Sequence, residues 1–161
     1  MKTILASKMP TEQVKANSKQ FTTFTVDGKV YGIDVMRVQE VTMPLQVTSM
    51  RSAPDFIKGL INLRGQIATA VGLRELFNLP ITGSDEKMTV VCRIDDILLS
   101  LLVDKIGDVI EVDDSSFENT PLTIPSNIRP FMDGVYKTDA TILSILNIDS
   151  IISELDKRCA S

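Results

Sequence analysis

The sequence has no histidine, no tryptophan and only two cysteines, and aromatic residues make up only 5% of it. Without histidine, a Ser-His-Asp or Cys-His nucleophile cannot be built, and most zinc sites lose their usual ligand. Cys92 and Cys159 are far apart and form neither a redox motif nor a metal-binding pair. Since a general base could only be a perturbed carboxylate or lysine, the sequence predicts a protein that is not an enzyme.

Positive charge and long apolar runs are also scarce. The chain carries 17 basic and 21 acidic residues, whereas nucleic-acid binders concentrate positive charge to neutralise phosphates. The longest apolar run, residues 97–103, is the length of a strand rather than of a membrane-spanning helix. At the N-terminus, polar residues and Pro10 follow only the short apolar pair Ile4-Leu5, which is too short for a signal peptide. We therefore expect a cytoplasmic protein with no nucleic-acid partner and no direct insertion into membranes.

The composition suits a globular protein. The chain has 161 residues, of which 43% are hydrophobic, enough for one ordinary domain or two very small ones. Residues 1–20 are polar and aperiodic, and we expect a flexible tail there, with a single short strand as the alternative. Order is expected to begin at Phe21.

Most of the remaining chain alternates between apolar and polar residues, as β-strands do. Asp27-Gly28 lies between two such segments and predicts a tight hairpin turn. The second strand of this hairpin is expected to run from Tyr31 to Val41. Arg64-Gly65 and Asp95-Asp96 predict two further turns of the same kind.

Helices are expected to be few and short. Residues 52–56 resemble a helix start, because Ser52 can cap and Pro54 suits the first turn. Residues 73–77 predict a second brief helix. Residues 149–161 predict a C-terminal helix and tail, in which Asp149 is the expected cap.

The two halves of the chain repeat one another. The segment from Tyr31 aligns with that from Leu99, and the segment from Gly59 aligns with that from Gly134. Short strands at this spacing favour barrels, because closure removes exposed sheet edges. We therefore expect a mainly β (all-β) fold of two pseudo-symmetric five-stranded barrels packed together, the first mainly at 21–82 and the second mainly at 86–150. A single sandwich is the alternative.

None of the motifs that could carry chemistry is complete. Gly28-Lys29 lacks the other residues of a phosphate-binding loop, and the acidic residues at 111–114 lack the glycine of a calcium loop. We predict no catalytic residue, no metal and no cofactor. Arg64, at a hairpin tip, is either a solvated turn residue or a recognition residue. Glu40 is its natural partner in an ion pair that would matter for geometry and specificity.

These residues carry a family resemblance. The segments VYGIDVMRVQEV, from Val30, and APDFIKGLINLRGQIATAVGLRELF, from Ala53, resemble the signature of the CheW-like domain family. Later segments resemble that family's closing part, so the match covers residues 21–152. One departure is Gly72, where family members commonly carry an aspartate.

The resemblance implies two intertwined SH3-like barrels and an adaptor that works without catalysis. Such adaptors bridge the cytoplasmic tips of methyl-accepting chemotaxis receptors to the regulatory domain of the chemotaxis histidine kinase, in arrays at the inner face of the membrane. Carried over by matching position, Val38, Glu40, Gly59 and Arg64 would lie at or beside the receptor- and kinase-facing surfaces. Strand residues 61 and 63 would support them.

Two other functions remain open at this point. One is a divergent paralogue serving a non-flagellar chemosensory circuit. The other is a small-ligand sensor that uses the cleft between the barrels, which predicts saturable binding of a metabolite.

Overall fold

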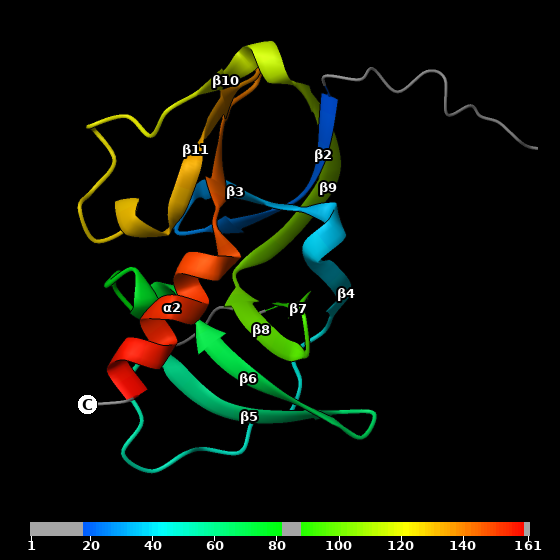
Figure 1. The fold of residues 1–161 in the computed structure, drawn as a ribbon, viewed down its shortest axis with the longest axis vertical. Coiled ribbons are helices and arrows are strands. Elements are labelled where there is room, and N and C mark those ends of the chain that lie inside the picture. The colour runs from blue at the N-terminus through cyan, green and yellow to red at the C-terminus, as the bar shows by residue number, and fades with distance from the viewer. Residues whose placement is uncertain (1–17, 82–87, 160–161) are drawn as a thin grey trace, which may run out of the picture.

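Two β-sheets form most of the protein in the computed structural model, which describes residues 18–81 and 88–159 (Figure 1). The six-stranded sheet contains, in spatial order, β10 (Phe117–Glu118), β11 (Met132–Lys137), β12 (Ile142–Leu146), β3 (Lys29–Asp34), β2 (Ser18–Val26) and β9 (Lys105–Asp113). The five-stranded sheet contains β4 (Val38–Thr42), β7 (Met88–Ile94), β8 (Ile97–Val103), β6 (Gln66–Gly72) and β5 (Ile57–Leu63). The prediction of a mainly β fold is confirmed.

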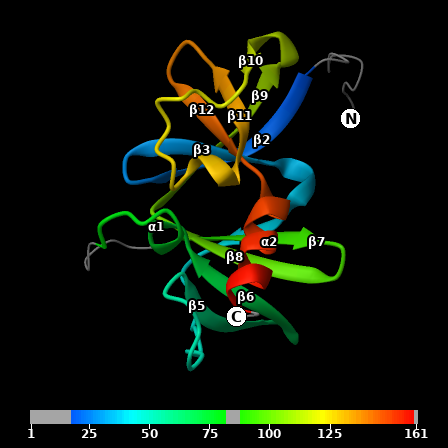
Figure 2. The same ribbon diagram turned by 60° about the vertical axis from the view of Figure 1, so that its left-hand side comes forward.

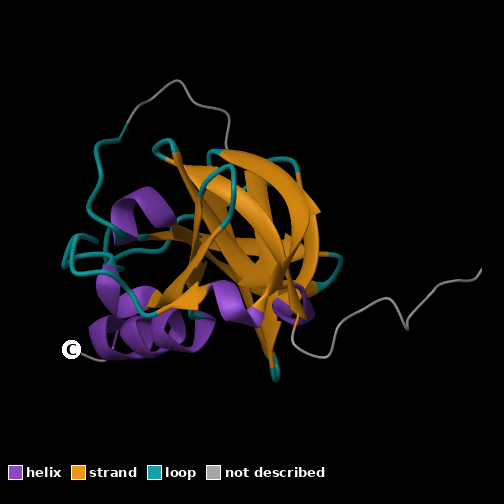
Figure 3. Ribbon diagram, turned by 90° about the horizontal axis from the view of Figure 1, so that it is seen from above, coloured by secondary structure: helices purple, strands orange, loops and turns teal. Residues whose placement is uncertain are grey.

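The helical segments lie around the periphery of the strands, as the view from above shows (Figure 3). They are η2 (Val35–Arg37), α1 (Leu73–Leu76), η3 (Asp114–Ser116), η4 (Arg129–Phe131) and α2 (Ile148–Cys159). The predicted brief helix after β6 and the C-terminal helix are both present. Within the described ranges, no helix combines the length and the apolarity needed to cross a membrane.

The predicted tight turns are present at all three positions. Asp27 and Gly28 have φ of 53° and 78°, and Arg64 and Gly65 have φ of 53° and 91°. Positive φ at both central residues is the signature of the type I′ turn, whose twist matches that of the flanking antiparallel strands. Asp95 also has positive φ, at 53°. The first strand begins at Ser18 rather than at Phe21, and residues 1–17 of the expected tail lie outside the described residues.

The strand expected from Tyr31 to Val41 is interrupted. The 3₁₀ turn η2 separates β3 from β4, and these two strands belong to different sheets. Asp104 alone separates β8 from β9, and these two strands also lie in different sheets. The chain thus crosses between the sheets twice (Figure 1), so the expected division near residues 82–86 does not separate one sheet from the other.

The sheets reproduce the sequence repeat strand by strand. β6 runs parallel to β8 with Thr69 opposite Leu99, and β12 runs parallel to β3 with Ser144 opposite Tyr31. The sequence alignment equates these two pairs of positions. Gly59 and Gly134 have φ of 144° and 159°, and each lies at a break in strand register. The expected pseudo-symmetry is therefore present, and β10 is the strand that the five-stranded sheet does not match.

The described strands form two open sheets rather than closed barrels. In the five-stranded sheet, the edge strands β4 and β5 do not pair with each other. The connector between them instead lies against the free edge of β5, where the amide and carbonyl of Thr48 exchange hydrogen bonds of 2.9 and 2.8 Å with Leu60. Because Thr48 occupies the backbone groups of Leu60 on this edge, β4 cannot pair with them to close the sheet into a barrel.

The helix expected at residues 52–56 does not form. Ser52 has φ of 62°, in the left-handed region, and the amide of Ile57 donates to the carbonyl of Pro54 in an isolated turn. The segment is fixed at both ends, because Thr48 is bound to β5 and Phe56 is buried in the core. The carbonyl of Phe56 also accepts a 2.8 Å hydrogen bond from the amide of Gly72, so it pairs with the end of β6 rather than with a following helical turn.

The C-terminal helix is capped by a different residue from the one expected. The Asn147 side chain accepts a hydrogen bond of 2.9 Å from the amide of Ser150, which makes Asn147 the cap in place of Asp149. Asp149 instead lies in the first turn of α2 and pairs with Arg37 at 3.4 Å. Figures 1 and 2 show α2 running from the junction between the sheets along the five-stranded sheet.

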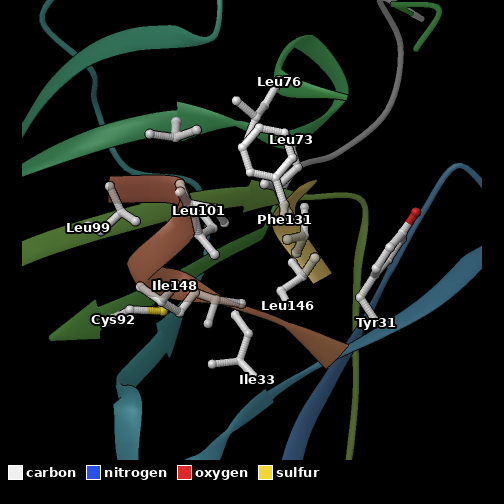
Figure 4. Packing of buried hydrophobic residues seen from close by; sticks show 14 of the residues in the cluster. Tyr31, Ile33, Leu73, Leu76, Cys92, Leu99, Leu101, Phe131, Leu146 and Ile148 are labelled. Atoms are coloured by element: carbon white, nitrogen blue, oxygen red, sulfur yellow. The ribbon is translucent and has the colours of Figure 1, made fainter. Parts of the chain in front are cut away.

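The main core lies between the two sheets and includes residues from both of them (Figure 4). Four aromatic rings form a chain through it: Phe24 to Tyr31 at 6.0 Å, Tyr31 to Phe77 at 5.5 Å, and Phe77 to Phe131 at 6.0 Å. Burial, followed by the negative charge of Asp27, raises the pKa of Tyr31 to about 12. α1 and α2 close the ends of this core with buried leucine and isoleucine side chains.

The face of the five-stranded sheet that points away from the main core includes small residues. Ala68 is fully buried there in a cluster with Leu63 and Val91. The hydroxyls of Thr89 and Ser100 are also buried in this sheet, and neither has a hydrogen-bond partner among the described residues. A buried hydroxyl without a partner destabilises the folded state by its lost hydration.

We therefore expect Thr89→Val to raise the free energy of unfolding by about 1 kcal/mol, measured by urea denaturation. Thr23→Val is the matched control, because the Thr23 hydroxyl is also buried but donates a 2.6 Å hydrogen bond to the carbonyl of Asp108. This control should lose stability. A loss of stability in both variants would show that the Thr89 hydroxyl is hydrogen-bonded in solution.

Candidate protein-interaction surface

The predicted pair of Glu40 and Arg64 is present. Glu40 lies on β4, Arg64 lies at the tip of the β5–β6 hairpin, and Arg64 Nη2 donates to Glu40 Oε2. β4 and β5 are the opposite edges of the five-stranded sheet, so this contact requires the sheet to curl until its edges approach each other. The Arg64 side chain is 69% exposed and that of Glu40 is 22% exposed. The guanidinium is therefore available to a partner while one of its nitrogens is bound.

The pair fixes the charge state of both members. The hydrogen bond from Arg64, together with its positive charge, holds the pKa of the Glu40 carboxyl below its usual range. The same hydrogen bond raises the pKa of Arg64. Both groups remain ionised near neutral pH, so the surface presents a fixed dipole rather than a group that titrates there.

A second polar bridge lies on the same sheet. Arg93, on β7, donates from Nε to Gln39 Oε1 at 2.7 Å and from Nη2 to Gln66 Oε1 at 2.9 Å. These contacts join β4, β7 and β6, and they hold the guanidinium of Arg93 in place. The sequence analysis did not predict this bridge. The positions of two residues could have indicated it, because Gln39 is adjacent to Glu40 and Gln66 follows the Arg64-Gly65 turn.

The structure gives Val38 and Gly59 different surroundings from those of the ion pair. Val38 is half-buried and packs against the main core, opposite Cys92. Gly59 is buried, and a Cβ at this position would overlap the carbonyl oxygen of Thr48. Val38 does not stand out from the surface as Arg64 does, and Gly59 has no side chain. Their effect on the surface would come through the positions of β4 and β5.

The residues expected to support the hairpin are buried. Ile61 and Leu63, on β5, are 1% and 5% exposed. Two exposed apolar side chains lie on strands next to the ion pair: Val41, 38% exposed, follows Glu40 on β4, and Ile67, 58% exposed, is on β6. The candidate interaction surface is therefore defined by the ion pair, with these two apolar side chains on neighbouring strands of the same sheet.

The departure at Gly72 has a local explanation. Lys58 Nζ and Glu75 Oε2 form an ion pair at 2.6 Å. The other carboxylate oxygen of Glu75 lies against Gly72, where a Cβ would overlap it. An aspartate at position 72 would therefore require the Glu75 carboxylate to move and would bring a second negative charge beside it.

The weaker sequence motifs lie in turns and at strand ends. Gly28-Lys29 and Asp95-Asp96 are in hairpin turns. Asp113 caps the 3₁₀ turn η3 by accepting a 2.9 Å hydrogen bond from the amide of Ser115. No group of three or more acidic or cysteine side chains within the described ranges is placed to hold a metal ion.

Comparisons with known proteins match nearly the whole chain. A family model described as the CheW-like domain matches residues 20–156. The chain is 29% identical over 150 residues to the chemotaxis protein CheW of Treponema pallidum, covering 88% of each chain. It is 27% identical over 151 residues to the protein of the same name from Bacillus subtilis, covering 93% of this chain and 96% of that one. The crystal structure of the scaffolding protein TtCheW from Thermoanaerobacter tengcongensis is similar with a TM-score of 0.73 and 30% identity, over 80% of this chain and 88% of that chain.

The structure predicts that Gly59 acts through the backbone. Gly59→Ala should lower the free energy of unfolding by about 3 kcal/mol or more, because the methyl group meets Thr48 and the left-handed φ is strained. Gly28→Ala is the control, since Gly28 also has a positive φ of 78° but an added Cβ meets nothing within 4 Å. It should lose about 1 kcal/mol. Equal losses in thermal or urea unfolding would show that Thr48 moves aside.

Proposed function

The chain belongs to the CheW-like domain family, and we propose from this that it is a non-catalytic adaptor in chemotaxis. It would couple the cytoplasmic tips of methyl-accepting receptors to the regulatory domain of the chemotaxis histidine kinase. The observation that carries the proposal is the Glu40–Arg64 pair, an exposed guanidinium held at a hairpin tip by a carboxylate on a different strand. A fixed, exposed charge of this kind favours recognition of a partner and contributes little to folding.

An adaptor needs at least two binding surfaces, and the pseudo-symmetric fold supplies two sheets of related shape but different side chains. The surface on the five-stranded sheet carries Glu40 and Arg64. The six-stranded sheet has Asp108 at the position that the repeat equates with Glu40, and Asp108 is exposed. Two chemically distinct surfaces on one rigid core would let the protein hold two different partners in a fixed geometry.

The proposal of a non-catalytic role is supported by the state of the cysteine in the core. Cys92 is free and buried, and desolvation raises its thiol pKa to about 12. The thiol therefore stays protonated at physiological pH and is a poor nucleophile. Its place in the core, opposite Val38 and Leu99, is that of a packing residue.

We place the protein in the cytoplasm, recruited to receptor arrays at the inner face of the membrane through its partners. Adaptor contacts of modest area are individually weak. In an array, each contact becomes effectively intramolecular once its neighbours have formed, so the assembly gains stability without new contacts. The fold would need only to keep its binding surfaces at a fixed distance and orientation.

We expect Arg64→Asp to abolish coupling while leaving the melting temperature nearly unchanged, because the residue is mostly exposed. Coupling is measured by co-sedimentation of the protein with receptor-containing membranes, with and without the kinase, while kinase autophosphorylation is followed. The wild-type protein should pellet and raise kinase activity. The reversed charge would place two carboxylates side by side and remove the guanidinium.

Two controls make this test specific. Arg51→Asp reverses another exposed arginine, in the connector before β5, and should leave coupling intact. The exchange Glu40→Arg with Arg64→Glu restores the ion pair in the opposite sense. Recovery of coupling in the exchange would assign the pair a positioning role, and continued loss would assign Arg64 a direct contact. Unfolding of Arg64→Asp would contradict the assignment of Arg64 to a binding surface.

A further inference from the structure

A cavity of about 420 Å³ lies beside the N-terminal end of α2, and neither Glu40 nor Arg64 lines it. Its walls come from both ends of the chain, because β2, β3, η2, β11, β12 and α2 all contribute to it. The residues that matter for its chemistry are Asp34, Arg37, Phe117, Asp133, Tyr136 and Asp149.

Three carboxylates line this cavity. Asp34 accepts a 2.9 Å hydrogen bond from the amide of Met36, and Asp133 accepts one of 2.7 Å from the side chain of Asn147. Asp149 pairs with Arg37 at 3.4 Å. In the described part of the chain, nothing hydrogen-bonds the second oxygen of Asp34 or of Asp133. Lys19 is the other cation on the wall, so the carboxylates outnumber the cations.

The remaining wall is aromatic and ends in a hydroxyl. The ring of Tyr136 lies 5.4 Å from that of Phe21 and 5.2 Å from that of Phe117, and all three residues line the cavity. Tyr136 is only 3% exposed, and its hydroxyl has no hydrogen-bond partner among the residues that the structure describes. Burial, and then the negative charges of Asp114, Asp133 and Asp34, raise the pKa of Tyr136, so several carboxylates lie close to this hydroxyl.

The other half of the molecule has a related ion pair with its charges exchanged. The sequence repeat equates Asp149 of α2 with Arg74 of α1. The Arg74 guanidinium is buried and held by Asp104, at the crossover, through hydrogen bonds of 3.0 and 2.7 Å, with the carbonyl of Pro80 at 2.7 Å. In the α2 half the helix supplies the carboxylate and the crossover supplies the guanidinium, because Asp149 pairs with Arg37 of η2. Within the described ranges no ion pair involves Asp34 or Asp133, the other two carboxylates of the cavity.

We propose that this cavity binds a guanidinium or alkylammonium group. Carboxylate oxygens on two sides can accept the parallel N–H donors of a guanidinium, and the aromatic rings can stack against its plane. The unpartnered hydroxyl of Tyr136 supplies one more acceptor. The carboxylates are not grouped closely enough to hold a metal ion, which favours an organic cation. The inference does not rest on the proposed adaptor role.

The test uses amide NMR of the full-length protein at constant ionic strength. Ethylguanidinium should give saturable shifts centred on Asp34, Asp133, Tyr136 and Asn147. Sodium chloride at the same concentration should not. Asp133→Asn and Asp34→Asn each remove one charge but keep an oxygen that can accept the existing hydrogen bond, so the fold should be preserved. Each variant should weaken binding about tenfold, the loss expected for one charge-assisted hydrogen bond.

Asp96→Asn is the matched control, because Asp96 is an exposed carboxylate in the β7–β8 turn of the other sheet. It should bind ethylguanidinium as the wild type does. Tyr136→Phe keeps the ring and removes the hydroxyl, and it should weaken binding by less than the aspartate variants. Shifts that fail to saturate, or that are equal in Asp133→Asn and Asp96→Asn, would overturn the proposal.

A second arm identifies the source of the cation. The peptide acetyl-Gly-Arg-Gly-amide presents the same guanidinium on a backbone. If it binds at least as tightly as ethylguanidinium, the site is built for an arginine side chain of a protein partner. If only ethylguanidinium binds, the site is built for a free organic cation. The spectrum of each unliganded variant verifies its fold, and if one aspartate variant does not fold, the other one decides.

Discussion

The apolar core between the two sheets depends on two crossovers, at η2 and at Asp104, because these are the points at which each repeat passes its chain from one sheet to the other. Neither sheet can be completed by one half of the sequence. Strands β2 and β3 need β9 and β12 as neighbours, while β6 needs β8. The aromatic chain from Phe24 to Phe131 fills the space between the sheets, so burying it requires both sheets at once. We therefore expect the molecule to fold as one cooperative unit.

This core determines the geometry of the candidate interaction surface. Glu40 and Arg64 lie on opposite edges of the five-stranded sheet, and only the curl of that sheet brings them together. Gly59 allows the connector to lie directly against β5, and Val38 fixes β4 against the core. The exposed part of the surface can thus change its chemistry with little effect on stability, while its buried support cannot. An adaptor that must keep its geometry and tune its partners benefits from this separation.

The two halves share a backbone plan but have diverged in their side chains. Ile61, Ala68 and Ala70 in the five-stranded sheet are matched by Tyr136, Leu143 and Ile145 in the six-stranded one. Beside α1, the helix supplies the buried cation Arg74 and the crossover supplies Asp104, whereas beside α2 the helix supplies Asp149 and the crossover supplies Arg37. The same topology therefore carries ion pairs of opposite sense at its two crossovers. This difference gives the two ends of the molecule distinct chemistry.

Residue chemistry along the chain was enough to predict the local features and the repeat. Asp27-Gly28 forms its turn because aspartate and glycine adopt positive φ readily, and Gly65 supplies the same freedom after Arg64. The alignment of Tyr31 with Leu99 matches the observed strand register. The sequence also predicted Glu40 and Arg64 as a pair. The three-dimensional structure was needed for the assignment of strands to sheets, the open edges, the turn in place of a helix at Ser52, the cap at Asn147 and the cavity beside α2. Each of these depends on contacts between segments far apart in the chain. The alternation of residues along a strand shows which of its faces is apolar, but it does not show which other strand pairs with it.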